Sequence, residues 1–297
     1  MSMKSFIRHS DSSFSIRIDY LISLIPAFIW SLFWFRLPAL ILVTVSVFAA
    51  VFTEALLGII KNARFTKPSL YCVYCAIVFT FTLYKNTSWV VALFGGVIIA
   101  LVINIFGGEG RSLIFAPLGA RLLIFAFFPS LIGIPDELPY EAIINGMLPT
   151  ETSFECMLGA VDGSVGAVSV ICLILAALYL LLRRISDMIL PMSFVVSSFA
   201  LFFAFPCIQG RNIESAIFEL LSSGVVFIAV FFMTDYASTP KTYTGKISVG
   251  VLCALITFAF RFLGFSIDSV YIACFASEML WMAVSVTINH LRRKNER

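Results

Sequence analysis

The sequence predicts an all-α polytopic membrane protein, and three observations support this fold class. Apolar residues make up 60% of the 297-residue chain and charged residues only 12%, and the mean hydropathy is +1.01. Soluble domains contain about 25% charged residues. The apolar residues form long blocks instead of amphipathic stripes, which is typical of helices in lipid. The basic residues separate the blocks and mark topology, so we expect a lipid bilayer around the chain and no nucleic-acid partner.

Ten apolar blocks are candidates for membrane spans. A helix that fully crosses the hydrocarbon core needs about 20 apolar residues, with a range of about 17–25. The first and third blocks are short, so we expect a tilted helix, a thinned bilayer or a broken helix there. The first twenty residues are polar and of mixed charge, so the first block is expected to be a span and not a cleavable signal peptide. The predicted spans are 21–35, 38–60, 70–84, 89–106, 112–132, 166–182, 188–205, 217–233, 247–265 and 270–291.

The positions of the basic residues support ten spans. If the N-terminus lies in the cytoplasm and ten spans alternate, fifteen Lys and Arg residues fall on the cytoplasmic side and four on the outer side. Cytoplasmic loops normally carry such an excess. Removing one span would destroy the segregation, so we expect both termini in the cytoplasm. The four outer residues are Arg36, Lys85, Arg211 and Arg261, and Arg121 remains inside a span.

The segment 133–165 divides the chain into two halves of five spans each. It contains six acidic residues and no Lys or Arg, and the alternation places it on the outer side as an acidic loop. The halves, 20–132 and 166–291, belong to a single membrane domain. Because five is odd, they have opposite orientations, as inverted repeats do. Each half has a polar break on the cytoplasmic side, at 106–121 and 234–246, which is either a binding site or a solvated turn.

Four charged residues lie within predicted spans, where a charge at the helix centre costs about 2.5–3.5 kcal/mol. Each is therefore expected to face protein or water, as part of an ion pathway or as an anchor for packing. Glu278 is the deepest acid and is the candidate for a proton or cation site. Glu54 lies nearer the cytoplasmic end, where Lys61 could neutralise it. The four residues are Glu54, Arg121, Glu219 and Glu278.

Arg121 follows Pro117 and Gly119, which are residues that interrupt helices. We therefore expect an opened helix at this point, in which the guanidinium reaches polar backbone groups. Together, Glu54, Arg121 and Glu278 form the predicted ion pathway.

No constellation of metal ligands is visible in the sequence. The two His residues, His9 and His290, lie near opposite ends of the chain. Cys72 and Cys75 form a C-x-x-C pair at the start of an apolar span, whereas a redox or metal pair needs thiolates in a polar or electropositive pocket. We expect structural cysteines there, with metal or cluster ligation as the alternative. The sequence predicts no catalytic residue.

The polar break at 234–246 resembles a segment of a known family. Thr234, Asp235, Tyr236 and Pro240 match the motif that recurs in the D subunit of the Rnf electron-transport complex and in the B subunit of the Na⁺-translocating NADH:quinone reductase. Further segments agree in order along nearly the whole chain. They are 7–27, 52–58, 106–110, 116–118, 157–185 and 261–273.

The resemblance implies a multi-pass subunit of an Rnf-like complex in the cytoplasmic (inner) membrane of a prokaryote, with other membrane subunits as partners. Members of this family work in complexes that pass electrons from ferredoxin or NADH and move Na⁺ or H⁺. By this resemblance, Gly107, Gly108, Gly110, Thr234 and Asp235 line the cytoplasmic end of a central pathway and bind a cofactor.

The resemblance also implies a flavin, and here the chain departs from the family pattern. The family attaches FMN through a phosphoester to a Thr on the outer loop, and Leu148 stands at that position. Thr150 and Thr152 are the alternative attachment residues. The Glu and Thr of a Gly-Glu-Thr-Ser motif are missing at 166–169. We therefore expect either FMN or riboflavin held without a covalent bond, or a subunit that has lost its flavin.

Two other functions remain open at this stage. The family fold resembles that of urea and ammonium channels, so the chain is alternatively a channel or transporter for a small solute or ion. It is otherwise a structural subunit without chemistry. The absorbance of the purified protein distinguishes the first hypothesis from the other two, because only an electron-carrying member holds a flavin.

Overall fold

The structure is a computed structural model, and it describes 13–62, 69–105, 115–133, 153–159, 163–166, 169–208, 213–222, 224–235, 239–240, 242–263 and 268–295. Across these residues the chain is 84% helical and contains no strand. The prediction of an all-α protein is therefore confirmed.

Most helices fall within or across the predicted apolar blocks, but one short helix, Ser153–Leu158, lies in the segment 133–165 that was expected to be a loop. The first helix begins at Ser13 and runs for 23 residues, so the expectation of a short first span is wrong. The third helix has only 12 residues, and the eighth block is divided into short pieces. The elements are α1 (Ser13–Phe35), α2 (Leu37–Asn62), α3 (Leu70–Phe81), α4 (Trp89–Ile105), α5 (Ala116–Phe127), η1 (Pro129–Leu131), α7 (Ser153–Leu158), α8 (Val170–Leu182), α9 (Ile189–Ile208), α10 (Ile213–Ser222), α11 (Val225–Phe227), η2 (Ile228–Phe232), α12 (Tyr243–Phe262) and α13 (Asp268–Asn295).

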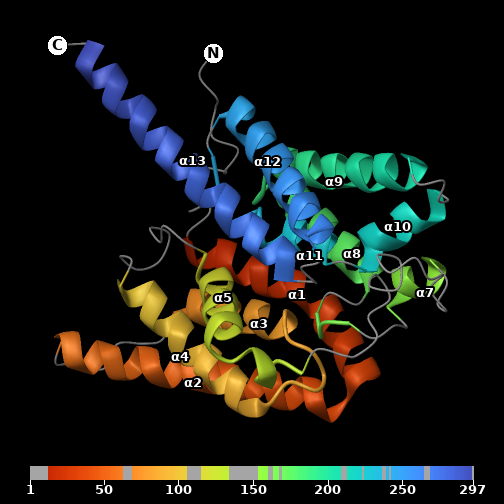
Figure 1. Cartoon of the computed structure of the whole chain (residues 1–297). Coiled ribbons are helices and arrows are strands. Elements are labelled where there is room, and N and C mark those ends of the chain that lie inside the picture. The colour runs from red at the N-terminus through yellow and green to blue at the C-terminus, as the bar shows by residue number, and fades with distance from the viewer. Residues whose placement is uncertain are drawn as a thin grey trace.

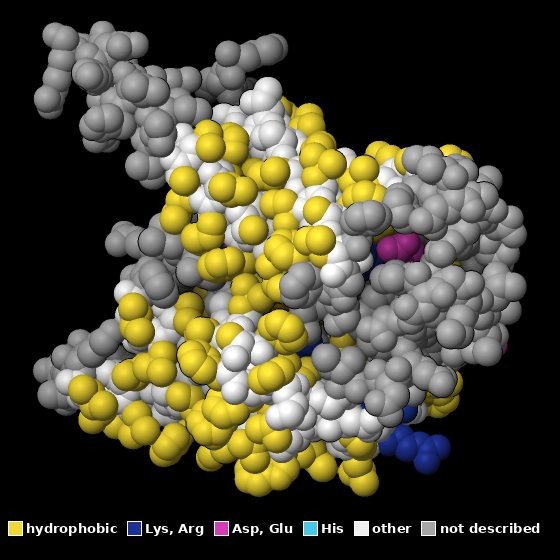
Figure 2. Space-filling view, in the orientation of Figure 1, with side chains coloured by type: hydrophobic (Ala, Val, Ile, Leu, Met, Phe, Trp, Pro, Cys, Tyr) yellow, Lys and Arg dark blue, Asp and Glu magenta, His cyan; other side chains and the backbone are white. Residues whose placement is uncertain are grey.

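The surface of the described residues is suited to lipid. Among these residues, three helical stretches are long and apolar enough to cross a membrane by length and composition, namely Phe14–Phe35, Leu37–Ile60 and Tyr243–Arg261. Figure 2 shows hydrophobic side chains over most of the described surface on one face, with charged side chains in few places. Monomeric soluble proteins rarely expose apolar patches of this extent. The composition and the surface therefore support a location in a membrane.

In the first group of helices, α1, α2, α4 and α5 pack around the short buried helix α3. In the lower part of Figure 1, α2 lies along α4 over a long contact, and α3 packs against α1, α2, α4 and α5. From Tyr71 to Phe81 most side chains of α3 are buried, and Phe79 and Phe81 are fully so. Ser69 caps the helix by accepting a hydrogen bond from the Cys72 N–H at 3.1 Å. A helix of this length is stable because its neighbours enclose it.

The later helices form a second group with a similar plan. In the upper part of Figure 1, α12 packs against both α9 and α13. The short segments α11 and η2 lie inside this group and contact α8, α9 and α13 between them. Their residues from Phe227 to Phe232 are 5% exposed or less. Gly224, with a φ of 74°, separates these segments from α10.

The two groups meet through α1 with α8 and through α5 with α13. An ion pair fixes the first of these contacts. Asp19 of α1 accepts two hydrogen bonds from the Arg183 guanidinium, at 3.0 and 3.2 Å, and one from the Tyr179 hydroxyl at 2.7 Å. The Asp19 side chain is nearly buried, whereas that of Arg183 is half exposed. The polar start of α1 is therefore accommodated by partners on α8.

The connection after α3 is non-helical backbone inside the protein. Leu83 and Tyr84 are fully buried, and the Leu83 carbonyl accepts a hydrogen bond from Val165 N–H at 2.7 Å. The Phe81 carbonyl accepts one from Gly166 N–H at 3.0 Å. Such backbone is tolerated at membrane depth only where protein encloses it. Gly166 is required because a Cβ atom there would lie 2.1 Å from the Phe81 ring.

Candidate functional site

The described part of the polar break at 234–246 begins where the π-helix η2 ends. η2 is buried throughout, and its last hydrogen bond runs from Met233 N–H to the Ile228 carbonyl at 3.0 Å. Short π-helical segments occur frequently at functional sites. The chain leaves the helix through Thr234 and Asp235, two residues that the sequence motif singled out.

Thr234 is fixed by two hydrogen bonds. Its hydroxyl donates to the Val230 carbonyl at 2.7 Å, and its own carbonyl accepts from the Tyr20 hydroxyl at 3.0 Å. The residue is 6% exposed. The hydroxyl is therefore used within the helix end, and the backbone of the break is tied to α1 from the other half of the chain.

Asp235 is half-buried at the same position. Its carboxylate lies within electrostatic range of Tyr20, Tyr74 and Cys75, which belong to α1 and α3. The motif therefore places a negative charge at the boundary between the two halves. The sequence identified Asp235 but gave no signal for the tyrosines around it.

Aromatic rings form a continuous series across this boundary. The ring centroids are 5.2 Å apart for Tyr20 and Tyr74, 6.3 Å for Tyr74 and Phe115, 5.1 Å for Phe115 and Phe232, and 5.8 Å for Phe232 and Tyr271. Aromatic pairs at these separations attract each other by about 0.5–1.5 kcal/mol beyond the burial of their area. The series joins α1, α3, η2 and α13 across the boundary.

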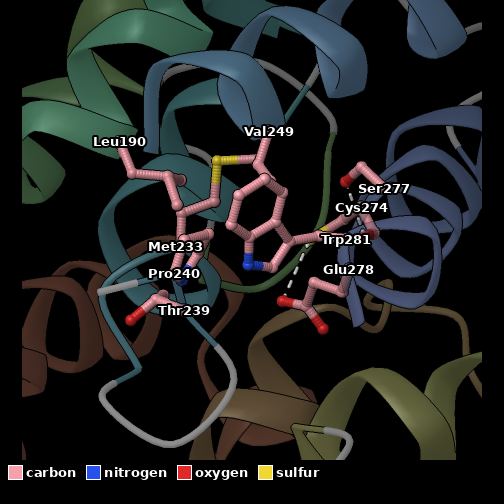
Figure 3. A pocket seen from close by; sticks show the side chains of 9 residues that line it. All are labelled: Leu190, Met233, Thr239, Pro240, Val249, Cys274, Ser277, Glu278 and Trp281. Atoms are coloured by element: carbon pink, nitrogen blue, oxygen red, sulfur yellow. Dashed lines mark hydrogen bonds between the residues drawn. The ribbon is translucent and has the colours of Figure 1, made fainter. Parts of the chain in front are cut away.

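Glu278 lines a small pocket beside the break. Figure 3 shows its carboxyl group near Trp281, with Thr239 and Pro240 from the connection before α12. The Cys274 thiol lies 3.9 Å from the Glu278 carboxylate. The other lining residues are Leu190, Met233, Val249 and Ser277. The structure thus brings the deepest acid of the predicted ion pathway together with Thr239 and Pro240 from 234–246.

Arg121 is fully buried in the middle of α5. Its guanidinium carbon lies 5.8 Å from the centroid of the Tyr84 ring and 5.5 Å from that of the Tyr271 ring. The expected opening of the helix is wrong, because α5 is continuous and Pro117 lies in its first turn, where Pro is tolerated. The side chain reaches aromatic faces from the connection after α3 and from α13.

Glu54 and Glu219 both have partners within the protein. Glu54 accepts a hydrogen bond from Ser69 N–H at 3.0 Å and so ties α2 to the start of α3, where a negative charge is favourable. The Lys61 side chain lies outside the described residues. Glu219 forms an ion pair with Arg261 at 2.8 Å, and Arg261 is 4% exposed. Arg261 therefore lies inside the protein, in the last turn of α12.

The described residues contain no group of three or more His, Cys, Asp or Glu side chains that could hold a metal ion. Cys72 and Cys75 form no disulfide and are fully buried on α3. Buried thiols in apolar surroundings are normally inert. This environment agrees with structural cysteines.

Several predicted site residues lie outside the part of the chain that the structure describes. They are Gly107, Gly108, Gly110, Leu148, Thr150 and Thr152. Most of the acidic segment 133–165 lies outside it as well.

Comparison with known proteins gives consistent results. The model of the NQR2, RnfD, RnfE family matches residues 1–293. The D subunit of the Na⁺-translocating ferredoxin:NAD⁺ oxidoreductase complex of Acetobacterium woodii is 29% identical over 278 residues, which cover 89% of this chain and 85% of the relative. The D subunit of the proton-translocating ferredoxin:NAD⁺ oxidoreductase complex of Clostridium ljungdahlii is 24% identical, with 86% and 85% covered. The B subunit of the Na⁺-translocating NADH-quinone reductase of Chromohalobacter salexigens is 26% identical, with 58% and 46% covered.

The resemblance predicted from the motif at 234–246 is confirmed by these matches, which extend far beyond that motif. The chain belongs to the NQR2, RnfD, RnfE family.

Proposed function

We propose that the protein is an integral membrane subunit of an Rnf-like complex that couples electron transport to ion translocation. The observation that carries this proposal is the match of the family over residues 1–293. The relatives named as D subunits of ferredoxin:NAD⁺ oxidoreductase complexes are covered over 85% of their length, so the likeness is not confined to one segment.

The test is to add an affinity tag to the chain in its native host and to purify it from membranes in mild detergent. Further membrane subunits should co-purify, and the preparation should reduce NAD⁺ with reduced ferredoxin. Deleting the gene should abolish this activity in membrane vesicles, and a plasmid copy should restore it. A chain that purifies alone, from membranes whose activity survives the deletion, would contradict the proposal.

We also propose that the fold consists of two inverted five-helix halves. The packing supports this when the five helices α1 to α5 are matched in order with five elements of the second half. These are α8, α9, the segment formed by α11 and η2 together, α12 and α13. The contact of α2 with α4 corresponds to that of α9 with α12, and the contact of α4 with α5 corresponds to that of α12 with α13. The pairs α1 with α8 and α5 with α13 then each join a helix to its own counterpart, as a two-fold axis requires.

A pair of glycines gives further support for the repeat. Gly96 and Gly250 are each the eighth residue of their helix, α4 and α12. A Cβ atom on Gly96 would lie 2.4 Å from the Ser46 carbonyl oxygen of α2. A Cβ atom on Gly250 would lie 2.0 Å from the Ser193 hydroxyl of α9 and 2.9 Å from the Phe194 nitrogen. Both glycines therefore allow the close approach of the corresponding helix pair.

Replacing either glycine with valine should destabilise the protein. We expect Gly96→Val and Gly250→Val each to lower the free energy of unfolding by about 1–3 kcal/mol or more, because the added side chain forces two helices apart. The measurement is unfolding in detergent, with Ala200→Val on the exposed face of α9 as the control. A loss no larger than that of the control would contradict the close packing.

The orientation follows from the same arrangement. We propose that both termini and the breaks at 106–121 and 234–246 face the cytoplasm, and that the acidic segment 133–165 faces the outside of a prokaryotic inner membrane. The distribution of Lys and Arg supports this, since it follows the positive-inside rule.

The cofactor proposal concerns a flavin near the break at 234–246. The described residues suit a neutral flavin such as riboflavin better than the phosphate of FMN, since the Asp235 carboxylate repels phosphate and accepts hydrogen bonds from N–H or O–H groups. A bound flavin would supply electron transfer, and the protein residues would orient it. On this proposal Asp235 holds the flavin, and the fixed backbone of Thr234 positions Asp235.

The purified protein should show the two absorption bands of an oxidised flavin in the near ultraviolet and the blue. Acid denaturation should release the flavin into the supernatant, since Leu148 cannot form the phosphoester that Thr forms in the family. Asp235→Ala should reduce the flavin content, whereas Glu155→Ala, on the exposed surface of α7, should not. A colourless protein would favour the structural subunit, or a channel if liposomes containing it conduct a solute.

A further inference from the structure

Cys253 and Cys274 meet at the contact between α12 and α13. Both side chains are fully buried, and neither forms a disulfide. The two helices follow each other in the chain after a short connection, and they pack against each other as an antiparallel pair. The thiols of Cys253 and Cys274 are hydrogen-bonded with each other. The structure therefore places two thiols from different helices in direct contact.

The register of the two helices accounts for this contact. Gly245, near the start of α12, lies so close to α13 that a Cβ atom there would be 2.5 Å from the Trp281 ring. Cys253 lies eight residues after Gly245, and Cys274 lies seven residues before Trp281. Each interval is about two turns of an α-helix. Antiparallel helices in this register bring Cys253 and Cys274 to the same level on their facing sides.

The two thiols differ in their access to a pocket. Cys274 belongs to the lining of the pocket beside Thr239 and Pro240, as Figure 3 shows, and Cys253 does not. The pocket has room for roughly one molecule the size of water. The Cys274 thiol also lies 3.9 Å from the Glu278 carboxylate, so its surroundings are not purely apolar. A small neutral reagent can therefore reach Cys274 before Cys253.

We propose that Cys253 and Cys274 are a modification site, at which a small peroxide forms a reversible disulfide between α12 and α13. In the first step, the Cys274 sulfur bonds to one peroxide oxygen and the O–O bond breaks. The other oxygen leaves as water with the thiol proton, and Cys274 becomes a sulfenic acid.

The second step uses the contact between the two thiols. The Cys253 sulfur bonds to the Cys274 sulfur, the S–O bond breaks, and a second water molecule leaves with the Cys253 proton. The two thiols together lose two electrons, and one hydrogen peroxide is reduced to two water molecules. The disulfide links α12 to α13 two turns from Gly245, where the segment 234–246 enters α12.

Treatment of the purified full-length chain with hydrogen peroxide tests the proposal. The remaining thiols are blocked with N-ethylmaleimide under denaturing conditions, and the protein is digested with trypsin. Because trypsin cleaves after Arg261, Cys253 and Cys274 fall on separate peptides. We expect mass spectrometry to find these peptides joined, with the loss of two hydrogen atoms, in most of the protein. Dithiothreitol should separate them, and the oxidised protein should have a higher midpoint of thermal unfolding than the reduced protein.

Cys172 provides the internal control. It is half-buried on α8 and thus more exposed than either member of the pair, so exposure alone predicts that peroxide modifies it first. The proposal predicts the link between Cys253 and Cys274 at peroxide concentrations that leave Cys172 unmodified. Modification of Cys172 without this link at every concentration would overturn the site.

Two variants test the order of the steps. In Cys253→Ser, Cys274 should stop at the sulfenic acid, which dimedone traps. In Cys274→Ser, Cys253 should stay reduced, because it does not line the pocket. Both variants should keep the gel-filtration profile and lose the rise in the unfolding midpoint. Equal oxidation of the remaining cysteine in the two variants would overturn the route through the pocket.

Discussion

Replacing Glu219 with alanine should lower the free energy of unfolding by about 3–5 kcal/mol, because it leaves the buried charge of Arg261 without its carboxylate. The two side chains form a 2.8 Å ion pair between α10 and α12 and are 12% and 3% exposed. The Arg261 guanidinium also lies 4.7 Å from the centroid of the Phe202 ring on α9. Unfolding in detergent, followed by circular dichroism, measures the loss.

The control is an ion pair that is accessible to solvent. Asp19→Ala breaks the ion pair with Arg183, whose side chain is 48% exposed, so the remaining guanidinium is hydrated and the loss should be smaller. The double variant Glu219→Leu with Arg261→Met should recover most of the stability, since hydrophobic residues often replace a buried pair at little cost. A loss within about 0.5 kcal/mol of zero for Glu219→Ala would mean that Arg261 is not buried in the folded protein.

Replacing Arg121 with alanine should cause the second large loss of stability. We expect the free energy of unfolding to fall by roughly 3 kcal/mol or more. A desolvated cation–π interaction contributes about 2 kcal/mol, and the vacated volume adds the cost of a cavity. The guanidinium lies 5.8 Å from the ring of Tyr84 and 5.5 Å from that of Tyr271, so its loss loosens the contact between α5 and α13. The midpoint of thermal unfolding in detergent reports this loss.

Arg121→Lys should recover little of the stability. An ammonium group is not planar and cannot stack on aromatic rings as the planar guanidinium does. Tyr84→Phe should have a small effect, since it keeps the ring. If Arg121→Lys is as stable as the wild type, the two rings do not determine the position of this charge.

The sequence predicted the positions of most helices because long apolar blocks are a local property. It failed at the start of α1, where Arg17 and Asp19 suggest a polar segment before the membrane. Asp19 is tolerated in a helix because the Arg183 guanidinium neutralises its charge and the Tyr179 hydroxyl donates a hydrogen bond to it. These partners are 164 and 160 residues away in the chain. Composition cannot reveal a pairing over that separation.

The same limit applies to single charges. The sequence gives no signal that Arg261, near the end of an apolar block, pairs inside the protein with Glu219, which lies 42 residues before it. Arg121 follows Pro117, which suggests an opened helix, yet Pro in the first turn of α5 leaves the helix continuous. Both outcomes depend on neighbours that the sequence does not place.

For the candidate site, the sequence identified the chemistry but not the surroundings. The motif identified Thr234 and Asp235, and the depth of Glu278 in its block identified this residue. The position of Thr239 and Pro240 beside Glu278 depends on how the connection before α12 folds back onto α13. The series of rings from Tyr20 to Tyr271 likewise results from packing between the two groups of helices.

Topology in the native membrane provides the most direct test of the two inverted halves. Protease sites would be inserted within 134–152, before 13 and after 297, and intact cells would be compared with inside-out vesicles. The arrangement predicts cleavage of the 134–152 site from the outside only and of both terminal sites from the cytoplasmic side only. Cleavage of all three sites from one side would mean an even number of crossings in each half, and the inverted arrangement would be wrong.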